Sequence, residues 1–338
     1  MAAAAAAGAG DGANATPAAA KTGMAAVAVF VVGWYAANCA FNIVNKQSLN
    51  LLGLPYFISL LELGVGCLWM LGAWATGAIP KPKISKGLLI ALLPVSLFHC
   101  VGHVSACLSF SKMAVSFGHV IKSTEPVFSV ALSGIFLGKT FPLAVWLSLL
   151  PIVAGASLSA MKELSFSLAG TNLALLSNVA MAMRSVASKK ALEDFQEVKG
   201  VNLYALMSFV SLLYLLPVAI VVESHLWADT FQRVIEVSAT KSFDILGLAQ
   251  LSGPVGLTIL LTVTGIFYHL YNQLSYDTMD SMNAVSFSVA NTMKRVAVIV
   301  SSVIFFQNPV GIMNWVGITV AIGGTYLYSL AARQAAKK

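Results

Sequence analysis

The sequence predicts an all-α integral membrane protein in which ten transmembrane helices form two inverted five-helix repeats. Of its 338 residues, 58% are hydrophobic and only 10% are charged, whereas roughly 25% of the residues of a soluble domain are charged. Apolar runs of roughly 20 residues recur along most of the chain, and that length matches the roughly 30 Å hydrocarbon core of a bilayer. Short motifs that recur in the two halves indicate the repeat.

Glycine, proline and charged residues divide the apolar sequence into candidate spans. The five spans of the first half are predicted at residues 24–45, 55–74, 87–110, 114–137 and 142–161. The five spans of the second half are predicted at residues 168–186, 201–222, 255–276, 284–306 and 310–330. The long connection at 223–251 mixes charged and apolar residues and has room for a short interfacial helix.

The tails differ in composition from the spans. The expected division is a disordered Ala/Gly-rich tail at 1–23, a first repeat at 24–163, a second repeat at 164–332 and a basic C-terminal tail at 333–338. The first 20 residues contain one acid, Asp11, and no arginine, so they match neither a secretory signal nor an Arg/Ser-rich transit peptide. A targeting peptide, where one exists, would precede this sequence.

Basic residues in the connections and tails are unevenly distributed between the two sides of the predicted bundle. The side that holds both termini carries Lys21, Lys81, Lys83, Lys86, Lys139, Lys189, Lys190, Lys199, Arg333, Lys337 and Lys338. The other side carries Lys46, Lys112, Lys162, Arg233 and Lys241. Because a Lys/Arg excess marks the side from which helices insert, an even number of spans with both termini on the basic side is self-consistent.

Matching motifs stand in the same order in both halves. Ala114–Phe117 (AVSF) opens the fourth span and Ala284–Phe287 (AVSF) opens the ninth, while Leu108–Phe110 (LSF) upstream corresponds to Leu274–Tyr276 (LSY). The last span of each half also starts near a proline and contains glycine, at Pro142 and Gly155 and at Pro309 and Gly323-Gly324. Because each half has an odd number of spans, the second copy is inverted, and such folds bind substrate near mid-membrane between the repeats.

Four basic residues lie within or at the ends of spans: Lys122, Arg184, Lys294 and Arg295. Three of these stand deep, and each buried Lys or Arg costs about 2.5–3.5 kcal/mol on insertion scales. The predicted spans contain two acids, Glu62 and Glu125, which are too few to balance the charge. A phosphate dianion is the natural missing partner, because Arg offers forked hydrogen bonds and Lys a point charge. The alternative is structural ion pairing, for which Glu125 is the local partner of Lys122.

Aromatic and imidazole groups accompany these cations at helical spacing. His103 lies near the end of the third span, and Lys122 lies about the same number of residues after the start of the fourth. Because consecutive spans are antiparallel, the two residues should lie at similar depth in the membrane. In the eighth span, Tyr268, Tyr271 and Asn272 share a face. Packing is the ordinary role of one such residue, but the matched placement in both halves predicts that His103 and Tyr271 face the ligand.

A polar stripe on the first span has two interpretations. Asn38, Asn42, Asn45 and Lys46 follow one face, and hydrogen bonding between helices explains them best. Lys46 and Arg184 lie near span ends, where the long side chain reaches the interface without a further role. The alternative is that Lys46, Arg184 and Asn42 are gate or entry residues.

Other classes of function find little support. The four cysteines lie inside apolar runs without CxxC spacing, so neither a metal nor a cofactor is predicted. The basic residues form no aromatic-interleaved patch for nucleic acid, and the sequence has no HExxH motif or catalytic triad, so an enzyme is not expected. The expected surroundings are a lipid bilayer, with a monomer favoured over a dimer.

The sequence resembles the plastidic phosphate translocator family, a branch of the drug/metabolite transporter group, over roughly residues 34–329. The shared motifs are Trp34-Tyr35 with Asn38, Phe41-Asn42-Ile43 with Asn45-Lys46, Ala114–Phe117 with His119, Lys122 and Glu125-Pro126, Tyr271-Asn272-Gln273, and Asn291–Arg295. The resemblance implies that Lys122, Lys294 and Arg295 bind phosphate and that His103 and Tyr271 contact the rest of the substrate. Ala106, Tyr268 and Asn272 would complete the organic part of the site.

The resemblance also implies exchange of inorganic phosphate for phosphorylated C3 metabolites, triose phosphate and 3-phosphoglycerate, across the inner plastid envelope. A histidine at His103 resembles the triose-phosphate and hexose-phosphate branches of the family. Ala106, in contrast, occupies a position where triose-phosphate members often carry Thr or Ser. A glucose 6-phosphate (C6) antiporter is therefore the first alternative, and a nucleotide-sugar or drug exporter of the same fold is a more distant one. The basic side with both termini would be stromal.

Overall fold

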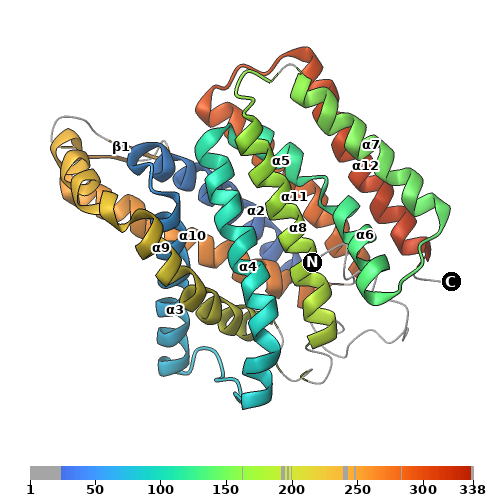
Figure 1. Ribbon diagram of the computed structural model, residues 1–338, viewed down its shortest axis with the longest axis horizontal. Coiled ribbons are helices and arrows are strands. Elements are labelled where there is room, and N and C mark those ends of the chain that lie inside the picture. The colour runs from blue at the N-terminus through green and yellow to red at the C-terminus, as the bar shows by residue number, and fades with distance from the viewer. Residues whose placement is uncertain are drawn as a thin grey trace.

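The computed structural model describes residues 24–161, 163–191, 195, 198, 200–238, 243–246, 249–282 and 284–335, and these form a bundle of long helices (Figure 1). The first half contains α2 (Met24–Leu52), α3 (Pro55–Thr76), α4 (Lys86–Lys112), α5 (Val115–Lys122), α6 (Glu125–Leu137) and α7 (Leu143–Met161). The second half contains α8 (Leu168–Ala191), α9 (Gly200–Ser238), α10 (Gly253–Ser281), α11 (Ala284–Phe306) and α12 (Ile312–Ala335).

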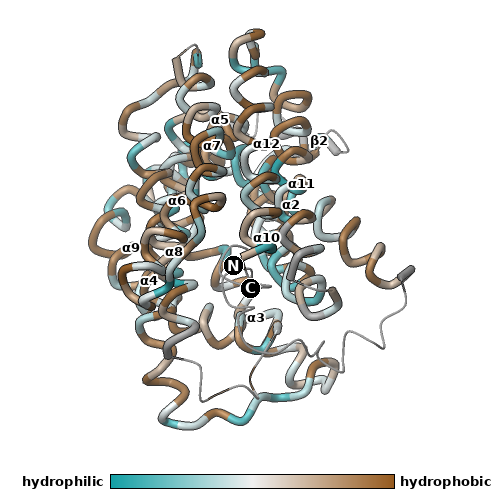
Figure 2. The backbone as a smooth tube through the Cα atoms, turned by 90° about the vertical axis from the view of Figure 1, so that its right-hand side faces the viewer, coloured by the Kyte–Doolittle hydropathy of each residue, from teal (hydrophilic) through white to brown (hydrophobic). Residues whose placement is uncertain are grey.

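The structure confirms a helical membrane protein. Among the described residues, nine helical segments are long and apolar enough to cross a membrane, with α5 and α6 counted together as Val115–Leu137. Helix α8 is of similar length but more polar, and it packs against α4 and α6 within the bundle. Hydrophobic residues occur along most of the helices (Figure 2). Many large ones are exposed, such as Leu150, which is 63% exposed, and Val221, which is 81% exposed. A bilayer gives such side chains an apolar environment.

Two helix ends differ from the expected positions. Helix α9 continues through Glu223 to Ser238, so its extension replaces the interfacial helix expected in the 223–251 connection. Two short antiparallel strands follow, β1 (Phe243–Ile245) and β2 (Ala249–Leu251), and the other described elements are helices, in agreement with the predicted all-α class. The first helix runs past residue 45 to Leu52 and includes the polar residues from Lys46 to Ser48, because no glycine or proline occurs between residue 45 and Gly53.

The fourth span is broken into α5 and α6 at Ser123 and Thr124. Pro126 stands in the first turn of α6, where its missing N–H costs nothing but would have left a gap in a continuous helix. The Ser123 hydroxyl donates to the Val120 carbonyl at 2.6 Å, and the Thr124 hydroxyl donates to that of Ile121 at 2.8 Å. The break therefore satisfies part of its own backbone and creates two helix ends in the interior of the bundle.

Helices α7 and α12 pack closely against each other and lie side by side in Figure 1. A side chain added at Gly155 would meet the backbone of Gly317 and Ala321, and one added at Gly324 would meet that of Ile152. Gly155 of α7 and Gly324 of α12 thus allow the two backbones to approach closely. Small residues are the usual means of close helix approach in a membrane.

Candidate functional site

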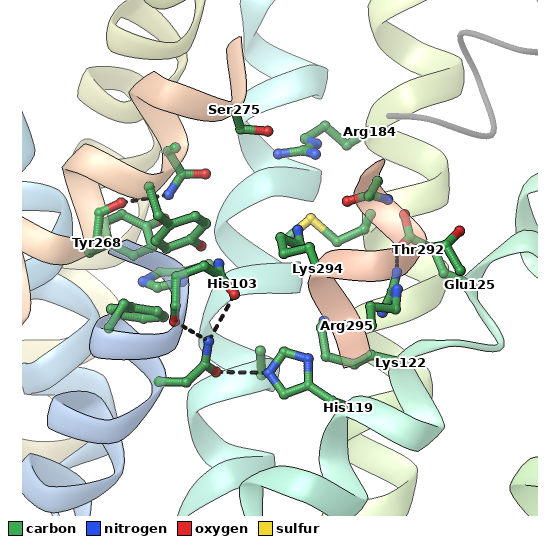
Figure 3. A pocket seen from close by; sticks show the side chains of 18 of the residues that line it. His103, His119, Lys122, Glu125, Arg184, Tyr268, Ser275, Thr292, Lys294 and Arg295 are labelled. Atoms are coloured by element: carbon green, nitrogen blue, oxygen red, sulfur yellow. Dashed lines mark hydrogen bonds and ion pairs between the residues drawn. The ribbon is translucent and has the colours of Figure 1, made fainter. Parts of the chain in front are cut away.

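A cavity of about 210 Å³ lies inside the bundle and is lined by residues of both halves of the chain. Every predicted site residue except Lys46 faces it: Asn42, His103, Ala106, Lys122, Arg184, Tyr268, Tyr271, Asn272, Lys294 and Arg295. Figure 3 shows two unlike walls. Lys122, Lys294 and Arg295 lie together on one side, and His103 and Tyr268 lie on the other.

The cationic wall is built by α5, α6 and α11. The Lys122 ammonium donates to the Ser177 hydroxyl on α8 at 2.9 Å, and the Lys294 ammonium lies 4.7 Å from the centre of the Trp34 ring. The Arg295 guanidinium donates to Glu125 Oε2 at 3.0 Å. Glu125, which the sequence offered as the local partner of Lys122, therefore pairs with Arg295 across the bundle.

The break between α5 and α6 positions two of these groups. Lys122 is in the last turn of α5 and Glu125 is the first residue of α6. A cation at a helix C-terminus and a carboxylate at a helix N-terminus both interact favourably with the partial charges of the unpaired backbone groups there. The broken span thus stabilises charges that a continuous apolar helix would not.

The cavity carries an excess of positive charge despite this ion pair. Its lining contains four Lys and Arg residues, Lys122, Arg184, Lys294 and Arg295, and one carboxylate, Glu125, so the formal net charge of these groups is +3. In the part of the chain that the structure describes, Glu62 is taken by His103 and lies outside the lining. The carboxylates of the lining are therefore too few to balance its cations, as expected from the sequence.

The opposite wall is aromatic and comes from α2, α4 and α10. The rings of His103 and Tyr268 lie 4.5 Å apart between centres, and those of Phe41 and Tyr271 lie 4.9 Å apart. Asn272 donates to the Tyr268 carbonyl at 2.8 Å, within its own helix. The cavity thus offers an aromatic, partly polar surface facing its cations.

His103 has a partner that the sequence did not reveal. Its Nε2 atom lies 3.0 Å from Glu62 Oε2, and Glu62 is fully buried on α3. The two residues are far apart in sequence, so only the packing of α3 against α4 brings them together.

The three possible gate residues have different surroundings. Arg184 donates to His99 Nδ1 at 2.9 Å and lines the cavity, so the interpretation that it snorkels to the interface was wrong. Lys46 donates to the Phe110 and Met113 carbonyls, at 2.5 and 3.2 Å, and joins α2 to the end of α4. Asn42 accepts a 2.8 Å hydrogen bond from His119 Nε2 and also faces the cavity, so the predicted bonding between helices is present.

The sequence reasoning missed part of the lining from α12. Thr325, Tyr328 and Ser329 face the cavity. Their signal was available, because polar residues at spacings of three and four on an otherwise apolar span share one face.

A cavity inside a helical membrane bundle, formed by both halves of the chain and rich in charge, is characteristic of a membrane transporter. The chain belongs to the Triose-phosphate Transporter family, which matches it over residues 25–329. This family consists of transporters and not enzymes, as the sequence predicted.

Three relatives illustrate the range of the family. The chain is 48% identical to the chloroplastic xylulose 5-phosphate/phosphate translocator of Arabidopsis thaliana, over 90% of this chain and 70% of the relative. It is 44% identical to glucose-6-phosphate/phosphate translocator 1 of the same plant, over 90% and 75%. It is 38% identical to the triose phosphate/phosphate translocator of Flaveria pringlei, over 89% and 70%. A solved crystal structure, 13% identical, matches 92% of this chain and 99% of its own with a TM-score of 0.57, which supports the fold alone.

Proposed function

We propose that the protein exchanges inorganic phosphate for a phosphorylated sugar or acid across a plastid membrane. The observation that carries this proposal is the cavity with a formal charge of +3 on its lining groups. The names of the relatives agree, because each pairs phosphate with a phosphorylated sugar.

The two walls suggest how the substrate binds. Lys122, Lys294 and Arg295 would hold the phosphate, Arg295 with the guanidinium nitrogens that Glu125 leaves free. The carbon part would then lie against the aromatic wall, with His103 and Tyr271 as its polar contacts. Tyr268, Asn272 and Ala106 complete that wall.

Cavity size favours a small substrate. The volume of about 210 Å³ lies below the roughly 300–1,000 Å³ typical of pockets for drug-sized ligands. This argues against a nucleotide-sugar or drug exporter. We keep C3 metabolites first and glucose 6-phosphate as the alternative, and the 48% identical relative adds a C5 sugar phosphate that the sequence reasoning had not considered.

Inverted repeats and alternating access complete the mechanism. The helix contacts are paired as an inverted repeat requires: α4 packs on α8 as α10 packs on α2, and α6 packs on α8 as α11 packs on α2. Glu125 and Arg295 each stand eleven residues after the first alanine of the shared AVSF motif, so their ion pair joins equivalent positions of the two repeats. Rocking of the repeats around this pair would expose the cavity to each side in turn.

We further propose that the membrane is the inner plastid envelope and that both termini face the stroma. The excess of basic residues, eleven against five, on the side of the termini supports this orientation.

Reconstituted protein in phosphate-loaded liposomes tests the function. Labelled phosphate should exchange against triose phosphate, 3-phosphoglycerate, xylulose 5-phosphate or glucose 6-phosphate, and the competition constants rank these substrates. Lys294→Ala should weaken phosphate binding about 10- to 150-fold, because a hydrogen bond to a charged group contributes about 1.5–3 kcal/mol. Lys81→Ala, in an exposed connection, is the matched control. Wild-type exchange kinetics in Lys294→Ala would refute the assigned site.

A further inference from the structure

A compact cluster of potential metal ligands lies beside the aromatic wall of the cavity. Its members are Glu62 on α3 and His103 and Cys107 on α4, all buried. Glu62 Oε2 is 3.0 Å from His103 Nε2 and 3.7 Å from Cys107 Sγ. The ligand atoms of the three residues all lie within 4.8 Å of one another.

This geometry is close to that of a zinc site. Zn²⁺ binds carboxylate oxygen, imidazole nitrogen and thiolate sulfur at about 2.0–2.3 Å in a tetrahedron, so neighbouring ligand atoms should be about 3.3–3.8 Å apart. His103 and Cys107 are four residues apart on α4 and share a face, as paired ligands on zinc-binding helices do. Small rotations of three side chains would bring the ligands to the required distances.

Unpartnered oxygen atoms at the same place supply a second, independent observation. Glu62 Oε1 and Asn45 Oδ1 are buried and have no hydrogen-bond partner among the described residues. Asn45 is 1% exposed and its side chain is within hydrogen-bonding reach of Cys107. Because a buried oxygen without a partner is costly, a bound cation would relieve the cost at both atoms.

The cluster can be reached, and the charges balance. His103, Cys107 and Asn45 line the cavity, which gives a metal ion an entry path. The ligands must bind deprotonated, so Zn²⁺ would displace the thiol proton of Cys107 and any proton on His103 into water. One carboxylate and one thiolate then neutralise the ion. His103 also lies on the wall opposite Lys122, Lys294 and Arg295 (Figure 3), away from the strongest repulsion.

We propose that Glu62, His103 and Cys107 bind Zn²⁺, and that the bound metal inhibits transport by engaging the imidazole of His103 that the substrate needs. The fourth coordination position is open to Asn45 or to a water molecule from the cavity. The inhibition rests on the proposed function, whereas metal binding does not.

Cobalt absorption tests the site without any transport assay. Detergent-purified protein titrated with Co²⁺ should show a thiolate charge-transfer band at one equivalent of metal, and Zn²⁺ should abolish it. Cys107→Ala should lack this band, and Glu62→Gln should bind at least about tenfold more weakly, since even outer-shell changes cost 10–100-fold. Cys100→Ala removes another buried thiol of α4 and should retain the band. Absence of the band in the wild type, or an unchanged band in Cys107→Ala, would overturn the metal site.

Phosphate exchange in proteoliposomes tests the inhibition. Zn²⁺, but not Mg²⁺, should inhibit the wild type and Cys100→Ala, while Cys107→Ala should exchange at its metal-free rate. Equal inhibition of Cys107→Ala would mean that Zn²⁺ only sequesters phosphate, and binding without inhibition would overturn the inhibitory role. Failure of the wild type to exchange phosphate in the absence of metal would instead refute the proposed function.

Discussion

Each cation of the cationic wall has a different kind of partner. Arg295 has a carboxylate, Lys122 a hydroxyl and Lys294 the face of Trp34. A hydroxyl and an aromatic ring orient an ammonium group without neutralising it, and a cation–π contact contributes only about 0.5–2 kcal/mol. Lys122 and Lys294 are therefore positioned but remain able to bind an anion.

The Arg295–Glu125 pair should matter for stability as well as for binding. Arg295→Ala removes the ion-pair partner of the largely buried Glu125 carboxylate. Breaking a buried ion pair in this way lowers the free energy of unfolding by about 3 kcal/mol. Glu125→Ala/Arg295→Ala should be less destabilised than the sum of the single variants, by about 0.5–3 kcal/mol. Chemical unfolding in detergent micelles measures this coupling. Additive effects would mean that the pair is not coupled.

Residue-level chemistry was predictable where it depends on the bilayer alone. Lys294 and Arg295 stand out in sequence because a charge inside an apolar span is costly whatever the tertiary fold. The Glu62–His103 pair was not predictable, since it depends on which faces of α3 and α4 meet.

At the scale of elements, the apolar runs predicted where each long helix lies, because length and hydropathy are set locally. The break after Lys122 was not predicted, although the polar residues from Lys122 to Glu125 interrupt the apolar run and Pro126 is typical of the first turn of a new helix. Glu223 was assigned to a connection because it is the first charged residue after an apolar run, but it lies within α9.

Glu223 of α9 caps α3 from a neighbouring helix. Its carboxylate accepts hydrogen bonds from the backbone N–H groups of Tyr56 and Phe57, at 3.2 and 2.6 Å. Leu54, at the cap position of α3, provides no side-chain bond. Glu223→Gln should lower the free energy of unfolding by about 1–3 kcal/mol, because a charge-assisted bond to a buried N–H is lost. The exposed Glu236→Gln is the control and should change stability by less than about 0.5 kcal/mol.

Neighbouring glycines of α12 provide a second test at this scale. A Cβ at Gly324 would lie 2.7 Å from the backbone nitrogen of Ile152, whereas one at Gly323 would meet nothing within 4 Å. Gly324→Ala should therefore destabilise the protein by about 1–3 kcal/mol through overpacking of α7 against α12. Gly323→Ala should be neutral or slightly stabilising, because alanine favours a helix over glycine. Equal unfolding midpoints in detergent would contradict this packing.

For the whole molecule, the charge of the cavity links binding to conformational change. Closing an empty cavity would remove a formal lining charge of +3 from contact with water. The free-energy cost is about 2.5–3.5 kcal/mol for each unpaired cation on insertion scales. A phosphate dianion removes most of that cost. Because a ligand shifts a conformational equilibrium only by its differential affinity for the states, the loaded protein should cross the occluded state far more often than the empty one. Obligate exchange then needs no coupling ion.

Removing one cation that is not assigned to the phosphate should convert part of the exchange into net uptake. Arg184→Gln lowers the cost of closing the empty cavity by up to about 2.5–3.5 kcal/mol, while Lys122, Lys294 and Arg295 still bind phosphate. The ratio of labelled phosphate uptake in empty vesicles to that in phosphate-loaded vesicles should rise about tenfold or more. Lys81→Gln removes the same charge from an exposed connection and should leave the ratio unchanged. An unchanged ratio in Arg184→Gln would show that the cavity's charge does not enforce the exchange.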